Sequence, residues 1–304
     1  MSDFETLLYE KTGAVARVTL NRPDRGNGIT LRMPREIAAA VERADLDPEV
    51  RVIALSGCGK GFCGGYDLVA SAEGRRGATD AEPSLAGSPL DPVVMAKNHD
   101  PSAPWDPTVD WAMMRRNVRG FMSLFFADKP VICKVQGFCV AGGTDLALCS
   151  DLLVVADDAK IGYPPARVWG VPTTALWAHR LGAQRAKRLL FTGDCLSGKE
   201  AVEWGLAIES APADHLDERF EALLGRIAQM PLNQLVMMKL LVNQTLLAQG
   251  LHASQLAGTF FDGIARHTAE GHAFVRRAME AGFKEAVRDR DEPYGDFGPS
   301  TYKG

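Results

Sequence analysis

The sequence Gln-Gly-Phe-Cys-Val-Ala-Gly-Gly-Thr-Asp-Leu-Ala-Leu-Cys at residues 136–149 is the most informative stretch of the chain. It follows an apolar, strand-like run at 131–135, passes Gly142 and Gly143, and opens into a short apolar helix that carries Asp145. A helix start exposes backbone N–H groups without intrahelical acceptors, and the helix dipole adds positive potential there. Such a place would stabilise an oxygen that gains negative charge during a reaction, with a carboxylate one turn away. The alternative is an ordinary strand–turn–helix connection with an exposed aspartate.

A second glycine-rich stretch, Gly-Cys-Gly-Lys-Gly-Phe-Cys-Gly-Gly-Tyr-Asp-Leu at 57–68, also follows a strand-like run. The residues that fit the dinucleotide-binding fingerprint G-x-G-x-x-G are Gly59, Gly61 and Gly64. That fingerprint also needs a second strand ending in an acid about 20 residues further on. Residues 71–92 are instead rich in Gly, Ala, Ser and Pro. We therefore interpret the stretch as a second turn that presents backbone N–H groups, around Tyr66.

Together the two stretches resemble the oxyanion segments of the enoyl-CoA hydratase/isomerase (crotonase) superfamily. Gly-Phe-Cys-Gly-Gly-Tyr-Asp-Leu (61–68) is similar to the first segment, and Val-Ala-Gly-Gly-Thr-Asp-Leu-Ala (140–147) to the second. Flanking pieces extend the resemblance in collinear order over about residues 4–284; they are Asn21-Arg22-Pro23, Thr192-Gly193-Asp194, and Phe261-Asp262 with Glu270-Gly271. The resemblance implies an α/β fold, a spiral of ββα units, with a helical C-terminal region that mediates homotrimers or dimers of trimers.

The resemblance also implies roles for individual residues. The backbone N–H groups of Tyr66 and Gly142 would hold a thioester carbonyl as it becomes an enolate. Family hydratases use two glutamates; Asp145 occupies one position, and Pro165 or Ala166, neither of which can move a proton, occupies the other. The further residues expected to bind substrate are Gly64, Gly65, Asp67, Gly143, Tyr163, Pro165 and Trp169.

The missing glutamate bears on the reaction. Adding water across a C=C bond conjugated to a thioester requires a base for the water and a proton source for the α-carbon, which two carboxylic groups can supply. Moving a double bond requires only one base that shuttles a proton, and Asp145 alone suits that reaction.

A long interruption at about 71–110 offers substitutes for the missing acid. Residues 71–92 have the composition of a flexible loop, and 97–110 gather acids, a histidine, a tryptophan and prolines. Long loops in compact domains are often lids or binding loops. His99 or Asp106 is the candidate catalytic group; the alternative is a solvated surface excursion with Asp-Pro turns. The other polar candidates there are Asp100, Asp110, Tyr163 and Arg167, of which the last is expected at the surface or in a subunit contact.

Alternating strand-like and helical patterns predict a parallel sheet, followed by helices. The expected strands are 15–20, 52–56, 131–135 and 152–156. The expected helices are 31–43, 111–126, 176–190, 216–228, 233–248 and 252–266. We expect a core over 1–210 and a helical region over 211–304 for oligomerisation and ligand closure.

Composition limits the function classes. The 304 residues are 46% hydrophobic with a net charge of -4 and no basic patch, which argues against nucleic acid as a partner. No apolar run is long enough for membrane insertion, and no signal peptide pattern is present, so we expect a cytoplasmic protein. The six cysteines form no C-x-x-C pair and indicate reduced thiols. His267 and His272 lack metal-site spacing, so no metal is expected.

These observations predict an acyl-CoA-transforming enzyme whose coenzyme A is part of the substrate, with no other cofactor. Hydration of 2-enoyl-CoA thioesters through an oxyanion-stabilised enolate is the leading reaction. One alternative is an enoyl-CoA double-bond isomerase with one base. Others are a hydrolase or C–C bond lyase with His99 as base, and a non-catalytic acyl-CoA binder.

Overall fold

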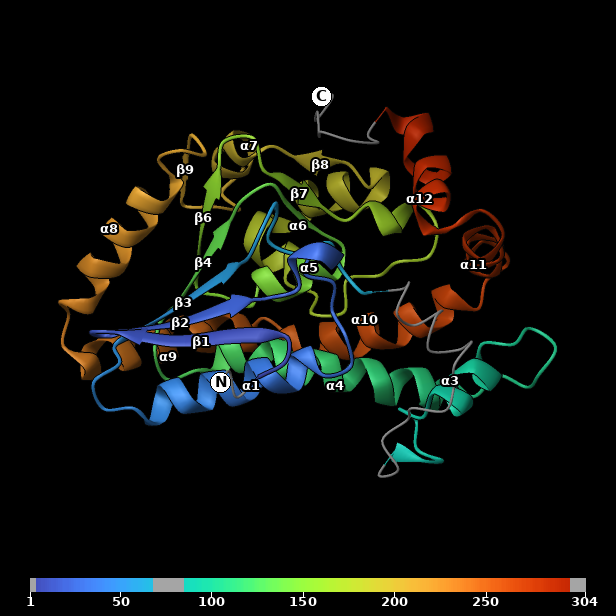
Figure 1. Cartoon of the computed structure of the whole chain (residues 1–304), viewed down its shortest axis with the longest axis horizontal. Coiled ribbons are helices and arrows are strands. Elements are labelled where there is room, and N and C mark those ends of the chain that lie inside the picture. The colour runs from blue at the N-terminus through green and yellow to red at the C-terminus, as the bar shows by residue number, and fades with distance from the viewer. Residues whose placement is uncertain (1–3, 68–84, 296–304) are drawn as a thin grey trace.

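The structure is a computed structural model that describes residues 4–67 and 85–295 (Figure 1). Its main sheet has six strands in the order β1-β2-β3-β4-β6-β9, and a smaller sheet has the order β5-β7-β8. The main sheet consists of β1 (Leu7–Thr12), β2 (Val15–Leu20), β3 (Val52–Gly57), β4 (Val131–Val135), β6 (Leu152–Ala156) and β9 (Glu209–Ala211). The smaller sheet consists of β5 (Phe138–Val140), β7 (Lys160–Gly162) and β8 (Cys195–Leu196). All four predicted strands are confirmed.

The central strands are parallel and apolar on both faces. β3 pairs with β2 and β4, in a register that sets Ile53 opposite Val131 and Leu55 opposite Cys133, and all four residues are buried. Near-continuous apolar runs are typical of parallel strands covered on both sides. Because parallel strands end at the same edge, the turns that follow β3 and β4 emerge next to each other.

Helices cover the sheet and extend beyond it (Figure 1). They are α1 (Met33–Leu46), α3 (Pro92–Asn98), α4 (Pro107–Phe126), α5 (Gly142–Ala147), α6 (Trp177–Thr192), α7 (Gly198–Glu203), α8 (Leu216–Ala228), α9 (Leu232–Ala248), α10 (Leu251–Arg266), α11 (Ala269–Ala281) and α12 (Phe283–Asp291). Short 3-10 helices are η1 (Pro23–Arg25), η3 (Pro164–Arg167) and η4 (Glu292–Tyr294). The six predicted helices are present, and α10 runs along α4 (Figure 1).

The predicted loop at about 71–110 is wrong for part of its length. Residues 92–98 form α3, because the Asp91 carboxylate accepts a hydrogen bond from Val93 N–H and Pro92 occupies the first turn. Residues 107–110 already belong to α4. The part of the prediction that concerns 71–84 lies outside the described residues.

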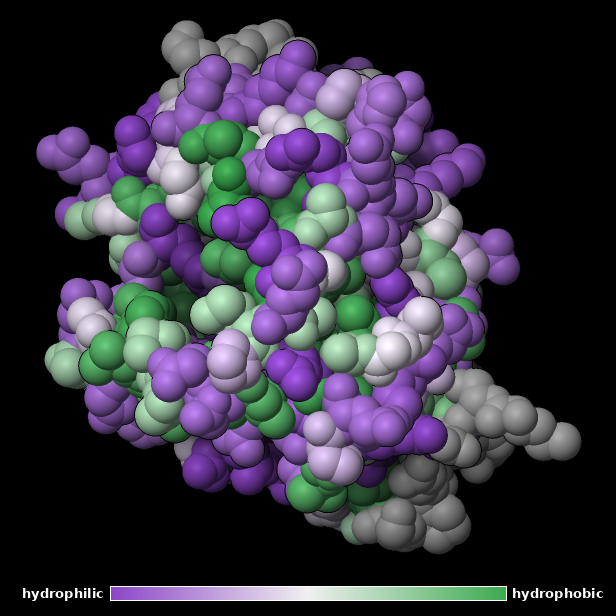
Figure 2. Space-filling view, turned by 90° about the vertical axis from the view of Figure 1, so that its left-hand side faces the viewer, coloured by the Kyte–Doolittle hydropathy of each residue, from purple (hydrophilic) through white to green (hydrophobic). Residues whose placement is uncertain are grey.

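Apolar side chains remain exposed on the outside of the molecule. Figure 2 shows the end that carries α8, where apolar residues lie in groups between hydrophilic ones. Other exposed large apolar residues are Met237, Met238, Leu240, Leu241 and Val242 on α9, and Leu256, Phe260, Phe261 and Ile264 on α10. Within residues 4–67 and 85–295, no helix is long and apolar enough to cross a membrane.

Candidate active site

The two glycine-rich turns lie against each other, because Cys63 in the first turn forms a parallel bridge with Cys139 on β5, the strand that leads into the second turn. Val140 N–H donates to the Cys63 carbonyl over 3.1 Å. Gly65 has a φ of +99°, and a Cβ atom placed on it would lie 2.8 Å from Ala141 Cβ and 3.3 Å from Gly142 N. The first turn therefore packs directly on the start of α5, and only glycine allows this approach.

Two backbone donors are available at this junction. Among the described residues, the N–H groups of Tyr66 and Gly142 donate to no acceptor in the protein. Ala141, which precedes α5, has a φ of +55°, a conformation that costs free energy outside glycine. A Cβ on Gly142 would lie 2.8 Å from the Tyr66 ring, and one on Gly143 would lie 2.3 Å from the Cys63 carbonyl oxygen. The glycines thus bring both N–H groups to one place, where an oxygen of a ligand can accept from them.

Asp145 is fully buried on α5, so the alternative of an exposed aspartate is wrong. One carboxyl oxygen, Oδ1, accepts from Thr174 N–H over 3.0 Å and from Thr174 Oγ1 over 2.8 Å. The other, Oδ2, has no hydrogen-bond partner in the described part of the chain. Burial raises the pKa of Asp145 to about 7. A carboxyl group with such a pKa can both accept and donate a proton near neutral pH.

A second buried carboxyl group, Asp262 on α10, lies within electrostatic reach of the first. Burial raises the pKa of Asp262, and its carboxylate forms an ion pair with Arg266 at 2.9 Å. Asp262 in turn contributes to the raised pKa of Asp145, after burial, and to those of Tyr66 and Tyr163. In the sequence, Asp262 stands only in the tail motif Phe261-Asp262 and carries no sign of a catalytic role. Its proximity to α5 depends on the packing of α10, for which the sequence carries no local signal.

The segment after β7 packs next to the residues that bind Asp145. Tyr163 is buried, and its hydroxyl donates to the Val171 carbonyl over 3.0 Å. A Cβ on Gly170 would lie 2.3 Å from Pro165 Cβ, so this segment folds closely back on η3. The Trp169 ring lies 5.9 Å, between centroids, from Phe274 on α11. Tyr163 and Pro165 therefore lie beside the segment that binds Asp145, and Trp169 lies toward α11.

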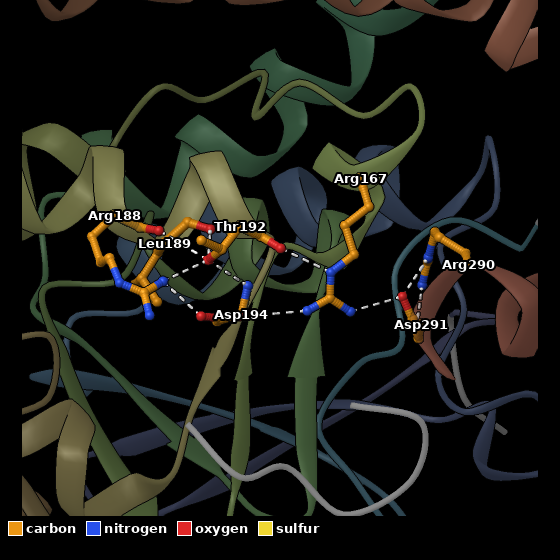
Figure 3. Close-up of polar contacts among 7 residues, drawn as sticks. All are labelled: Arg167, Arg188, Leu189, Thr192, Asp194, Arg290 and Asp291. Atoms are coloured by element: carbon orange, nitrogen blue, oxygen red, sulfur yellow. Dashed lines mark hydrogen bonds and ion pairs between the residues drawn. The ribbon is translucent and has the colours of Figure 1, made fainter. Parts of the chain in front are cut away.

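Arg167 lies in a buried cluster with Asp194 and Asp291 (Figure 3), so the expectation of a surface arginine is wrong. Its place in a subunit contact stays a prediction. Its side chain is 1% exposed and lies between Asp194, at 3.4 Å, and Asp291, at 3.0 Å. Its Nε donates to the Thr192 carbonyl over 2.9 Å, and Arg290 binds Asp291 from the other side. The arginine links η3 to the end of α12.

The remaining residues of the first turn have structural contacts. Asp67 forms an ion pair with Arg22 at 2.8 Å, which fixes the turn to the loop after β2. Gly64 N–H donates to the Gly26 carbonyl over 2.9 Å. Both contacts hold the backbone on either side of Tyr66.

The two candidates from the insertion lie in different environments. Asp106 is exposed, and its carboxylate caps α4 by accepting from Thr108 N–H and Oγ1 over 2.9 and 2.6 Å. The structure does not bring Asp106 to the buried carboxyl groups, because its place at the start of α4 leaves it in solvent. The His99 ring lies 5.1 and 5.4 Å, between centroids, from His267 and His272 at the junction of α10 and α11.

Asp110, rather than Asp106, connects the insertion to α10. Its buried carboxylate accepts from Asn98 and Trp105, each over 2.9 Å. It also contacts His267 Nε2 at 2.9 Å and forms an ion pair with Arg266 at 3.2 Å. Since Arg266 also binds Asp262, the insertion reaches the site through this arginine.

The sequence pattern of the enoyl-CoA hydratase/isomerase family matches residues 10–91 and 110–279. This chain belongs to that family. The match omits 92–109, which hold α3 and the start of α4. The chain is 56% identical to a Mycobacterium smegmatis enoyl-CoA hydratase of known structure, covering 98% of this chain and 97% of that one, with a TM-score of 0.92.

Two further relatives have lower sequence identity. A Xanthobacter autotrophicus Py2 enoyl-CoA hydratase/isomerase structure is 26% identical over 95% of this chain and 98% of its own, with a TM-score of 0.81. A carnitinyl-CoA dehydratase of Proteus mirabilis is 29% identical over 228 residues, which cover 74% of this chain and 75% of that protein. The predicted crotonase-like fold is thereby confirmed.

Proposed function

We propose that this chain is an enoyl-CoA hydratase that adds water reversibly to 2-enoyl-CoA thioesters. The supporting observation is the meeting of two N–H donors, from Tyr66 and Gly142, beside the buried carboxyl group of Asp145. The thioester oxygen accepts from both donors and gains negative charge as the enolate forms. A donor of this kind is worth about 3 kcal/mol in the barrier, because it is already oriented and excluded from water.

Asp145 is the principal proton-transfer group in this proposal. Thr174 fixes one of its oxygens and leaves Oδ2 without a protein partner among the described residues. Because burial raises its pKa to about 7, the carboxyl group holds a proton in a large fraction of molecules at neutral pH. It can therefore deliver a proton to the α-carbon in hydration and remove one in dehydration. Coenzyme A enters as part of the substrate, and the scheme needs no other cofactor.

Double-bond isomerisation is the second candidate, and the observation in its favour is the identity of Pro165 and Ala166. One of the two occupies the position of the second family glutamate, and both lack a group that can move a proton. Asp145 alone could then move one proton between two carbons of the substrate.

Incubation with 2-enoyl- and 3-enoyl-CoA esters in oxygen-18 water separates the reactions. Hydration places the label on the β-carbon, and Asp145→Asn should abolish labelling. An unlabelled product with a shifted double bond would replace the proposal by the isomerase. Release of free coenzyme A would indicate the hydrolase, and binding without any product would indicate the non-catalytic acyl-CoA binder.

We also propose assembly into homotrimers or dimers of trimers through the C-terminal helices. α9 exposes five large apolar residues and is apolar around most of its circumference, a pattern typical of helices that a partner covers. Sedimentation equilibrium should give three or six times the mass of one chain; a monomer would contradict this. A cytoplasmic location is part of the same proposal.

A further inference from the structure

One short backbone segment, residues 171–174, holds two buried carboxyl groups that come from distant parts of the chain. Thr174 donates to Asp145 Oδ1 through its N–H and its hydroxyl. At the other end of the segment, Val171 N–H donates to the Asp262 carboxylate. Gln255 on α10 donates to the Thr174 carbonyl over 3.1 Å, which fixes the segment to the helix that carries Asp262. The segment therefore sets the position of Asp145 relative to Asp262.

Both carboxyl groups lie within electrostatic reach of Tyr66, the residue that supplies one of the proposed oxyanion donors. Asp145 and Asp262 act electrostatically on the hydroxyls of Tyr66 and Tyr163, whose pKa values are raised first by burial and then by these two charges. Tyr66 also supplies one of the N–H donors, and the Tyr163 hydroxyl donates to the Val171 carbonyl, in the segment that binds both carboxyl groups. Asp145 Oδ2 adds a buried acceptor without a partner in the described residues. The site thus has the two carboxyl groups that hydration requires, although neither is at the position of the second family glutamate.

Arg266 makes the two groups unequal. It binds Asp262 at 2.9 Å and Asp110 at 3.2 Å, whereas no ion pair with Asp145 occurs among residues 4–67 and 85–295. Two neighbouring buried carboxyl groups do not readily ionise together, and a cation favours the ionised form of the group beside it. Arg266 therefore favours the negative charge on Asp262 and leaves the proton to Asp145. One base and one acid result, as water addition requires.

We propose that Asp262 is the second proton-transfer group and acts on the attacking water. This inference rests on the proposed hydratase function. Asp262 takes a proton from water as the water oxygen bonds to the β-carbon. The electron pair of the C=C bond moves toward the thioester oxygen and forms the enolate. The enolate then takes the Asp145 proton at its α-carbon. Asp262 has gained one proton and Asp145 has lost one, so a proton returns from Asp262 to Asp145 before the next turnover.

The test compares Asp262→Asn and Asp145→Asn by two readouts. The first is hydration of 2-enoyl-CoA esters. The second is exchange of the α-protons of the matching saturated acyl-CoA with deuterium oxide, which needs the oxyanion donors and one base but no attacking water. Asp214→Asn serves as the matched control, because it makes the same chemical change on a side chain that is exposed to solvent. Circular dichroism and thermal unfolding check that each variant folds.

Asp262→Asn should lower hydration about 100- to 10,000-fold while it retains α-proton exchange within about tenfold. Exchange continues because Asp145, without a charged neighbour, ionises more easily. Asp145→Asn should lose both activities. Hydration near the wild-type rate in Asp262→Asn overturns the proposal, as does equal loss of both activities in that variant, which would indicate a structural role. If the wild-type protein exchanges α-protons but never hydrates, the hydratase function itself fails, and the two failures are thus distinguishable.

Discussion

The site has two sides that are built in different ways. The turns at 61–68 and 140–147 act through their backbone, and a Cβ atom on Gly142 or Gly143 would collide with the neighbouring turn. The opposite side, where α10 meets the insertion, acts through charged side chains, with Arg266 between Asp262 and Asp110. Steric changes should therefore damage the first side, whereas changes of charge without change of shape should damage the second.

Asp145 lies between the two sides, and its replacement by asparagine should have the largest effect on the rate of hydration. The change keeps the acceptor for Thr174 and removes the proton-transfer group. Loss of a general acid or base lowers the rate about 100- to 10,000-fold. Steady-state hydration kinetics would measure this, with unchanged acyl-CoA affinity as the control. Full activity on a true substrate would remove Asp145 from the mechanism.

Gly142→Pro tests the backbone side by deleting one N–H donor. Loss of such a donor costs about 3 kcal/mol in the barrier, or about 100-fold or more in the rate. Gly142→Ala is the companion variant, since it keeps the N–H but places a Cβ 2.8 Å from the Tyr66 ring. A folded proline variant with near wild-type turnover would contradict the assignment.

Gly143→Ala should lower stability, because its Cβ would lie 2.3 Å from a backbone oxygen that cannot easily move. We expect a loss of about 1–3 kcal/mol in the free energy of unfolding. The matched control is Gly225→Ala on α8, where nothing lies within 4 Å of the added atom and a gain of about 0.5–1 kcal/mol is expected. Urea denaturation of both variants gives the comparison. Equal effects at the two glycines would refute the close packing of the turns.

The raised pKa of Asp145 also makes stability depend on pH. Between pH 3.8, its ordinary value, and about 7, the folded protein keeps a proton that the unfolded chain releases. Stability from this group is therefore present at low pH and is lost as pH rises to about 7. Asp145→Asn removes this dependence, so the variant should gain on the order of 2 kcal/mol over wild type between about pH 5 and pH 8. If the difference in unfolding free energy between the variant and wild type did not change over this pH range, the Asp145 carboxyl group would be ionised throughout the range.

Asp106→Ala should have the smallest effect, because this residue caps a helix in solvent. Loss of a helix cap costs about 1 kcal/mol in stability. Hydration activity should persist, within about threefold, a change far smaller than the loss of a general acid would cause. A loss of hydration comparable to that of Asp145→Asn would restore the hypothesis that Asp106 is the second acid.

The two sides also differ in what the sequence could predict. Glycines next to apolar strand runs mark turns by local chemistry, and so the strands and α5 were predicted from the residues. The meeting of both turns was implied only by the resemblance to the family. Asp262 lies on an amphipathic helix like the others of the tail, and its proximity to Asp145 results from the packing of α10 along α4. Arg167 and Asp110 became buried for the same reason, since their partners lie on α12 and on α10.

A crystal structure of Asp145→Asn with a bound 2-enoyl-CoA ester, in which turnover is blocked, would test the oxyanion assignment directly. The thioester oxygen should accept hydrogen bonds of about 2.7–3.1 Å from Tyr66 N–H and Gly142 N–H. The α-carbon should lie beside residue 145, and the β-carbon should face Asp262. A thioester oxygen that contacts neither N–H group would contradict the central claim that the two glycine turns form the oxyanion site.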